Sequence, residues 1–312
     1  MLQESDIQYY NEAQASDTGL RRASQVEQLR RSIGEKESPS DHDIILFIKA
    51  GSDRTSIGCD AFSQRFFMVL WLKGIPFNVR TIDRDTAPKD RELLREIAPG
   101  TSPPFLLFNG EVLTDIIKIG EFLEAELCPP RYPSLAPVHR ESALAGNDCF
   151  QKFSAWVKQN NTAPGSQTTS NNGNAAETRF FKSLKNLDHF LTKPLNYEKE
   201  PINQQTGSSK RPFLDGQDLT MPDCIMLPKL YIMVTAGKLR KNWHLTEEEY
   251  PGIFRYLEAA KTRKEFIESC AEESEVDFAY GGRGKRPSKR GSVVQLGTGS
   301  SSSVSSFTSA RF

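Results

Sequence analysis

The apolar residues of this 312-residue chain begin with strand-like and helix-like runs in alternation. Residues 44–48 form an unbroken apolar run, which is typical of a strand buried on both faces. Residues 62–73, followed by Gly74, are predicted to form a helix, and the alternation in 77–82 predicts a second strand. A polar helix is expected over 89–97. The chain therefore opens as an α/β unit.

A hairpin and a further helix are predicted next. Residues 103–108 lead into an Asn-Gly dipeptide, which is a strong turn signal between antiparallel strands, and 111–113 would be the return strand. Thr114 is expected to cap a helix that runs to about Leu127. These elements complete a small mixed sheet with helices packed on it.

The second half of the chain is predicted to be helical. Strand signals nearly vanish beyond a stiff proline-rich segment. Thr220 and Asp223 form a capping-box pattern, with Pro222 inside the first turn of the helix that follows. Helices are expected near residues 140–160, 176–193, 221–237, 247–259 and 262–270.

We therefore divide the chain into five segments. They are a flexible N-terminal extension (1–42), an α/β domain (43–128), a proline-rich linker (129–137), an all-helical C-terminal domain (138–276) and a disordered tail rich in basic residues and serine (277–312).

Composition narrows the function classes. The chain has 40 Lys and Arg against 40 Asp and Glu, so no overall field favours nucleic acid as a partner. The five cysteines and four histidines have no regular spacing, which argues against a disulfide framework and against a metal site. The N-terminus lacks the apolar core of a signal peptide, and we expect a reducing, cytoplasmic compartment.

The loop before the helix at 62–73 carries the candidate chemistry. Asp60 stands at the helix mouth, directly after Cys59. A cysteine at a helix N-terminus is activated because the helix dipole and free N–H groups stabilise its thiolate. An aspartate is a better cap but forms no mixed disulfide. Asp60 is therefore interpreted as a structural cap, and Cys59 as either a redox residue or a small buried hydrophobe.

Several runs of this sequence form a recognisable set. They are Lys49-Ala50-Gly51-Ser52-Asp53, Phe62-Ser63-Gln64-Arg65, Phe67-Met68-Val69-Leu70-Trp71-Leu72-Lys73-Gly74, Pro104-Phe105-Leu106-Leu107, Glu121-Phe122-Leu123-Glu124-Ala125, Leu127-Cys128-Pro129-Pro130-Arg131-Tyr132-Pro133, Phe213-Leu214-Asp215-Gly216 and Leu227-Pro228-Lys229-Leu230. Through these runs the chain resembles the chloride intracellular channel family, over roughly residues 43–276.

The resemblance implies a glutathione-transferase-like fold, with a thioredoxin-like α/β N-terminal domain and an all-α C-terminal domain. Most vertebrate members have Cys-Pro-Phe-Ser at the helix mouth, so the family's redox cysteine corresponds to Asp60 here. Invertebrate members, particularly those of nematodes, show a similar aspartate. This substitution argues against the glutathione-dependent oxidoreductase activity of the family.

The resemblance also implies a binding site for glutathione. No cofactor is expected. Pro104 would be a cis-proline whose neighbouring backbone pairs with a peptide-like ligand. Thr114 and Asp115 would hold the γ-glutamyl end. The alternative is that these residues form only a tight turn and a helix cap.

The membrane segment implied by the resemblance is 60–82. It is long enough, since about 20 residues cross a bilayer core, but Lys73 near its centre costs about 2.5–3.5 kcal/mol. Insertion is therefore expected only as an oligomer, with Arg65 and Lys73 facing a pore. Together with Trp71, these are the first choices for membrane or pore contacts. The alternative is a helix buried between the sheet and the helical domain.

The sequence thus favours an amphitropic protein, cytoplasmic and membrane-associated, that supports chloride transport. Membrane lipids and cytoskeletal or signalling proteins are the expected partners. Two alternatives remain open: a glutathione-dependent oxidoreductase that uses Cys59, and a membrane scaffold or adaptor that does not conduct.

Overall fold

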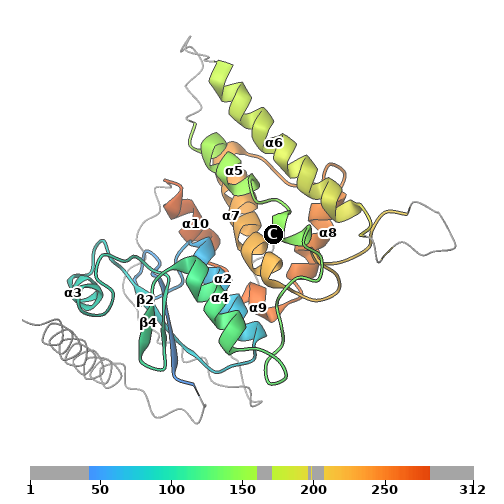
Figure 1. The fold of residues 1–312 in the computed structure, drawn as a ribbon. Coiled ribbons are helices and arrows are strands. Elements are labelled where there is room, and N and C mark those ends of the chain that lie inside the picture. The colour runs from blue at the N-terminus through green and yellow to red at the C-terminus, as the bar shows by residue number, and fades with distance from the viewer. Residues whose placement is uncertain (1–41, 160–170, 196–197, 199–206, 282–312) are drawn as a thin grey trace, which may run out of the picture.

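The computed structural model describes residues 42–159, 171–195, 198 and 207–281 (Figure 1). Nearly all of the expected N-terminal extension and most of the expected tail lie outside the described residues.

A four-stranded mixed sheet forms the N-terminal part, in the order β2-β1-β3-β4. Strand β1 (Ile44–Lys49) pairs in parallel with β2 (Asn78–Ile82) and antiparallel with β3 (Phe105–Phe108), which pairs with β4 (Glu111–Leu113). Asn109 and Gly110 join β3 to β4 with φ values of 49° and 89°. The Asn-Gly hairpin is confirmed, because these two residues adopt such left-handed angles most readily.

Both faces of the sheet are covered by helices. Helices α2 (Ala61–Leu72) and α4 (Ile116–Glu126) pack on the face formed by Ile44, Leu46 and Ile48, and α3 (Pro88–Ile97) covers the opposite face (Figure 1). Alternate residues of β1 therefore enter two different cores. This explains why the strand reads as a continuous apolar run.

The rest of the described chain is helical. Its elements are a short 3₁₀ helix η1 (Ser142–Leu144), α5 (Cys149–Val157), α6 (Asn171–Thr192), α7 (Met221–Lys241), α8 (Pro251–Ala260), α9 (Lys264–Ile267) and α10 (Glu273–Ala279).

Two details differ from the sequence prediction. The single helix expected over 140–160 is divided into η1 and α5, and Gly146 lies between them at φ +69°, outside helical geometry. Helix α10 was not predicted, since its seven residues include three acidic ones and give no clear helical period. It crosses the predicted boundary at residue 276.

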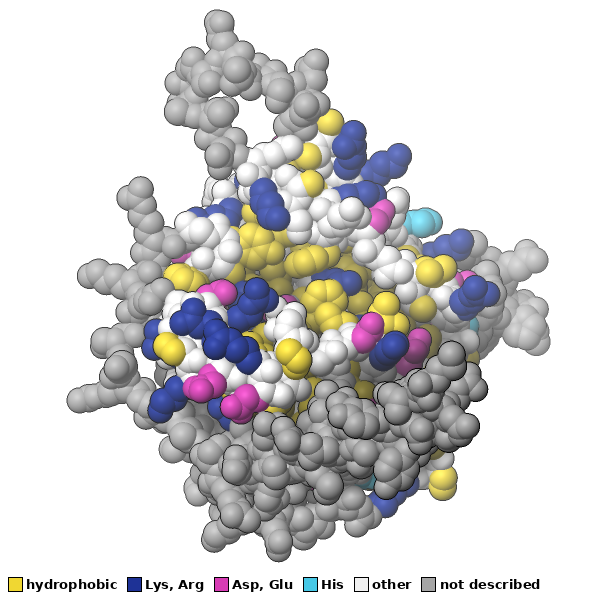
Figure 2. Space-filling model, turned by 60° about the vertical axis from the view of Figure 1, so that its left-hand side comes forward, with side chains coloured by type: hydrophobic (Ala, Val, Ile, Leu, Met, Phe, Trp, Pro, Cys, Tyr) yellow, Lys and Arg dark blue, Asp and Glu magenta, His cyan; other side chains and the backbone are white. Residues whose placement is uncertain are grey.

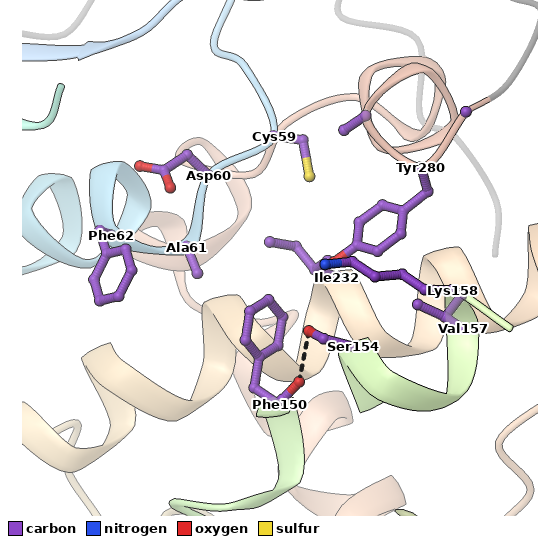
Figure 3. Close-up of a pocket in the computed structure, with 12 residues that line it drawn as sticks. Cys59, Asp60, Ala61, Phe62, Phe150, Ser154, Val157, Lys158, Ile232 and Tyr280 are labelled. Carbon is purple, nitrogen blue, oxygen red and sulfur yellow. Dashed lines mark hydrogen bonds between the residues drawn. The ribbon is translucent and has the colours of Figure 1, made fainter. Parts of the chain in front are cut away.

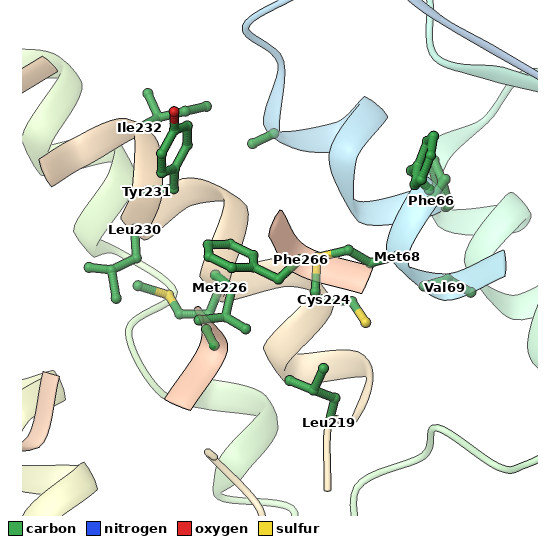
Figure 4. Packing of buried hydrophobic residues seen from close by; sticks show 14 of the residues in the cluster. Phe66, Met68, Val69, Leu219, Cys224, Met226, Leu230, Tyr231, Ile232 and Phe266 are labelled. Carbon is green, nitrogen blue, oxygen red and sulfur yellow. The ribbon is translucent and has the colours of Figure 1, made fainter. Parts of the chain in front are cut away.

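The two parts share one core. Phe66, Met68 and Val69 of α2 belong to the same buried cluster as Cys224 and Leu230 of α7 (Figure 4). The capping box predicted for α7 is present, with the Asp223 carboxylate accepting from the Thr220 N–H at 2.8 Å. The fold class expected from the sequence is confirmed: an α/β part joined to a helical part.

Candidate functional site

Asp60 is the N-cap of α2. Its carboxylate accepts hydrogen bonds from the Ser63 N–H at 2.8 Å and from the Ser63 hydroxyl at 2.5 Å. The Ser63 hydroxyl oxygen in turn accepts from the Lys49 N–H at 3.2 Å, which ties the helix start to the end of β1. The geometry is that of a structural cap, with the carboxylate satisfying N–H groups that an α-helix leaves free at its start.

Cys59 lies beside this cap and faces a cavity closed by Tyr280 (Figure 3). Burial raises the pKa of its thiol to about 12; the charge of Lys49 lowers this pKa, while the charges of Asp60 and Glu275 raise it. The thiol is therefore protonated at neutral pH. Since the thiolate is the reactive form of cysteine, Cys59 is poorly prepared for disulfide chemistry.

The residues predicted to hold glutathione lie at the ends of β3 and α4. The peptide bond between Pro103 and Pro104 is cis, and Pro104 is buried at the start of β3. Thr114 and Asp115 are exposed. Asp115, and not Thr114, caps α4, because its carboxylate accepts from two N–H groups of the first turn at 2.8 and 3.0 Å. Their role in ligand binding remains a prediction.

Lys73 follows the C-terminal end of α2 and is fully buried. Its ammonium donates to the carbonyl oxygens of Leu127 at 2.7 Å and Pro133 at 2.8 Å, and lies 2.8 Å from the Glu124 carboxylate. In this structure Lys73 therefore joins α2 to the end of α4 and to the proline-rich linker.

Arg65 and Trp71 are half-buried. Trp71 packs on Phe67, with ring centroids 5.7 Å apart. The Arg65 guanidinium lies over the Phe66 ring, and its Nη2 is 3.8 Å from the sulfur of Met221. Its Nε is buried without a hydrogen-bond partner, and no carboxylate among the described residues forms an ion pair with it. Arg65 thus carries a cation into the contact between α2 and α7.

The implied membrane segment 60–82 contains the cap, α2, a turn and β2. In the part of the chain that the structure describes, no helix combines the length and the apolar character needed to cross a membrane.

The cavity beside Cys59 was not predicted from the sequence. It has a volume of about 410 Å³ and lies between the start of α2, α5, α7 and α10. Lys158, the residue that follows α5, lines it with a solvent-exposed side chain (Figure 3). No local motif marks this residue, because the cavity forms only when segments far apart in the sequence pack together; even Ile232 of α7 and Ala279 of α10 are 47 positions apart.

Residues 42–130 match the family model of the CLIC-like N-terminal domain. This part of the chain is a CLIC-like domain. The family resemblance seen in the sequence is thereby confirmed, and the CLIC-like domain carries the helix mouth with Asp60 and the sheet described above.

Three solved structures share the overall fold. EXC-4, the CLIC homologue from C. elegans, is 20% identical with a TM-score of 0.57, over 76% of this chain and 84% of its own. Dehydroascorbate reductase from Chlamydomonas reinhardtii is 22% identical with a TM-score of 0.57, over 76% and 97%. Glutathione transferase Omega 3C from Trametes versicolor is 16% identical with a TM-score of 0.54, over 78% and 94%. The CLIC-like domain and the helical part therefore form a glutathione-transferase-like fold.

Proposed function

We propose that this chain is an amphitropic CLIC-like protein without thiol chemistry: a cytoplasmic form associates with membranes and there supports chloride transport. The observation that carries the non-redox part is the Asp60 carboxylate at the start of α2. A disulfide oxidoreductase needs a thiolate at a helix N-terminus, and a carboxylate forms no mixed disulfide. The high thiol pKa of Cys59 argues against its acting as the replacement.

Association with a membrane is supported by the CLIC-like domain and by exposed apolar side chains. Three of these exposed side chains are Phe62 (40% exposed), Ile117 (69%) and Leu144 (67%). One face of the molecule shows apolar side chains in its middle with basic and acidic ones around them (Figure 2). Apolar surface with basic neighbours is the combination that binds an anionic lipid interface.

Conduction needs a larger change than binding. Helix α2 has 12 residues and is about 18 Å long, against about 30 Å for a bilayer core. A span over 60–82 therefore requires β2 to leave β1 and Lys73 to leave the carbonyl groups it contacts. We propose membrane binding as a first step and spanning as a separate second step.

The test separates these steps with two readouts on the same sample: flotation with anionic liposomes, and chloride efflux from them, across pH 5 to 8. Dose-dependent flotation with efflux is the expected result. Flotation without efflux would point to a membrane scaffold that recruits protein partners, and absence of flotation would overturn the proposal.

Arg65 is the residue of choice for testing the anion pathway. Lys73 has three structural contacts, so its replacement would disturb the fold itself. Arg65→Gln removes a cation that has no carboxylate partner among the described residues, and should reduce chloride efflux per bound protein. Arg91→Gln, on the exposed side of α3, is the matched control for total charge.

A further inference from the structure

Arg65 of α2 is a half-buried cation with an incomplete set of partners. Among the described residues, its Nε has no hydrogen-bond partner and its Nη2 meets only the sulfur of Met221, at 3.8 Å. Burial lowers the pKa of Arg65, and the one described group whose negative charge would raise it is the thiol of Cys224. The guanidinium is therefore partly desolvated without a carboxylate to balance it.

Lys229 is a second half-buried cation, on the neighbouring helix. It lies on α7, which packs beside α2 (Figure 4). Burial lowers the pKa of Lys229, and the positive charge of Arg65 lowers it further. An effect of this kind requires the two charges to be near each other. The one described group whose negative charge would raise this pKa is the thiol of Cys149.

The two thiols near these cations supply no negative charge. Cys149 and Cys224 are fully buried. Burial raises the pKa of Cys149 to about 11, and it raises the pKa of Cys224 well above its ordinary value. The charges of Lys229 and Arg65 oppose these increases without overcoming them. Both thiols are thus protonated at neutral pH, and the two cations stay uncompensated.

Helix α4 has no acid at the point where it meets Arg65. The residue there is Gly120, and a Cβ at this position would lie 2.7 Å from Nη2 of Arg65. Glu124, one turn later on the same helix, is already paired with Lys73. In the part of the chain that the structure describes, the contact between α2, α4 and α7 thus holds two neighbouring cations that no carboxylate neutralises.

We propose that Arg65 and Lys229 together bind one phosphate dianion, either as free phosphate or as a phosphate monoester. Two cations match two negative charges, and a guanidinium can donate to two phosphate oxygens at once. Each side chain keeps part of its surface exposed, so an anion can reach the pair from solution. A monoanion such as chloride neutralises only one of the two charges and should bind more weakly. This binding belongs to the folded form described above and does not depend on the proposed membrane function.

The test is isothermal titration calorimetry of the full chain with inorganic phosphate at pH 8, where a phosphate group is mainly a dianion. A saturable heat with one phosphate per chain is expected in a buffer of constant chloride concentration. Glycerol 3-phosphate is titrated in parallel. The tighter of the two ligands identifies the natural form, and equal affinities would assign the site to the phosphate group that both share.

Variants of the two cations locate the site. Arg65→Gln and Lys229→Met should each weaken phosphate binding by about 10- to 100-fold, because each removes hydrogen bonds between charged groups. Lys229→Arg should retain binding. Lys182→Met, at an exposed position of α6, is the matched control and should leave binding unchanged. Lys229→Met should be at least as stable as the natural protein, since it removes a half-buried charge that repels Arg65.

A second pair of variants tests the charge balance from the side of α4. Gly120→Glu and Gly120→Gln place side chains of nearly the same shape against the flexible end of Arg65 and differ in charge. The carboxylate introduced by Gly120→Glu should pair with Arg65 and compete with phosphate. Gly120→Glu should therefore weaken phosphate binding at least about tenfold more than Gly120→Gln does.

Four outcomes would overturn the proposal. The first is no saturable heat from either ligand with a protein of native circular dichroism. The second is undiminished phosphate affinity in a folded Arg65→Gln or Lys229→Met variant. The third is equal phosphate affinity in the two Gly120 variants. The fourth is a loss in Lys182→Met equal to that in Lys229→Met, since the effect would then be one of total charge.

Discussion

The ammonium of Lys73 lies 2.8 Å from the carboxylate of Glu124, and this contact holds three separate parts of the chain together. Lys73 also donates to the carbonyl oxygens of Leu127 and Pro133. Glu124 accepts a hydrogen bond from the Leu135 N–H at 2.9 Å. The end of α2, the end of α4 and the linker after α4 thus meet at one buried charge.

Replacing Lys73 by Met should destabilise the protein strongly. The substitution leaves Glu124 without its counter-charge and two carbonyl oxygens without a donor. Breaking a buried ion pair from one side costs about 3–5 kcal/mol of unfolding free energy. Since the Glu124 side chain keeps 26% of its surface exposed, we expect the lower end of this range, measured by urea unfolding followed by circular dichroism.

Lys152→Met provides the control for this measurement. Lys152 pairs with Asp148 on the exposed side of α5, and pairs of this kind contribute about 0.5 kcal/mol or less. If Lys73→Met lost no more stability than Lys152→Met, the structural role of Lys73 would be wrong.

The same ion pair predicts a dependence of stability on pH. Burial by itself would raise the pKa of Glu124, but hydrogen bonds from Lys73, Leu135 and Ser134 outweigh it and hold the pKa below its ordinary value of 4.5. A carboxyl group whose pKa is lower in the folded state stabilises the fold above its unfolded pKa, and this contribution is lost as the pH falls through the folded value.

Glu124→Gln should therefore flatten the decline in unfolding free energy below about pH 4.5. The measurement is a series of urea unfolding curves for both proteins between pH 3 and pH 7. The variant should be less stable than the natural protein near neutral pH, with the two curves converging in acid. A constant difference across the whole series would contradict this assignment.

Thiol labelling should distinguish Cys59 from Cys128. Cys128 is exposed, whereas the pKa of Cys59 is raised to about 12 by burial. Because iodoacetamide reacts with the thiolate, labelling of Cys59 at pH 8 should be at least about 100-fold slower than that of an ordinary exposed cysteine. Peptide mass spectrometry over a time course reads out each site. Equal rates at the two sites would show that Cys59 is accessible and ionised.

Asp60→Cys in a Cys128→Ser background should create a reactive thiol on an unchanged scaffold. The new side chain takes the N-terminal end of α2, where helix N–H groups lower the pKa of a thiol. We expect a mixed disulfide with oxidised glutathione, detected by an increase in mass, in this variant and not in the Cys128→Ser parent. Failure of the variant to react would mean that more than the cysteine is missing from the site.

Asp60 at the start of α2 and Asp223 at the start of α7 should differ in their effect on stability. Asp223 is fully buried, and its carboxylate accepts from the Leu214 N–H and the Tyr256 hydroxyl, each at 2.9 Å, in addition to capping α7. Asp60 caps α2 through Ser63 alone. Asp60→Ala should cost about 1 kcal/mol, as a lost cap does. Asp223→Ala should cost at least about 2–3 kcal/mol more, because buried donors are left unpaired. Thermal and urea unfolding compare the two, and similar losses would contradict the burial argument.

Local signals in the sequence were sufficient for the elements near the helix mouth. The apolar run of β1, the Asn-Gly turn and the Thr220–Asp223 capping box each act within a few residues, so a short pattern contains the physical cause. The capping role of Asp60 was predictable for the same reason, since an N-cap contacts only the first turn of the helix that follows it.

Contacts between distant segments were not predictable in this way. Lys73 was expected as a candidate pore residue, and its burial depends on carbonyl groups 54 and 60 positions later. The end of α10 closes the Cys59 cavity, and Glu275 of this helix accepts hydrogen bonds from Ser52 across 223 positions. No pattern within one element marks such pairs, and Lys158 was overlooked for the same reason.

The packing of α2 against α7 cannot form during synthesis until α7 has been translated. The last residue of α2, Leu72, precedes the first residue of α7, Met221, by 149 positions. At about 5–20 residues per second of translation, roughly 7–30 s pass before the partner helix has been made. During this interval the side of α2 that packs on α7 has no permanent cover. A nascent chain is thus open to chaperones and to lipid surfaces for many seconds before its core closes.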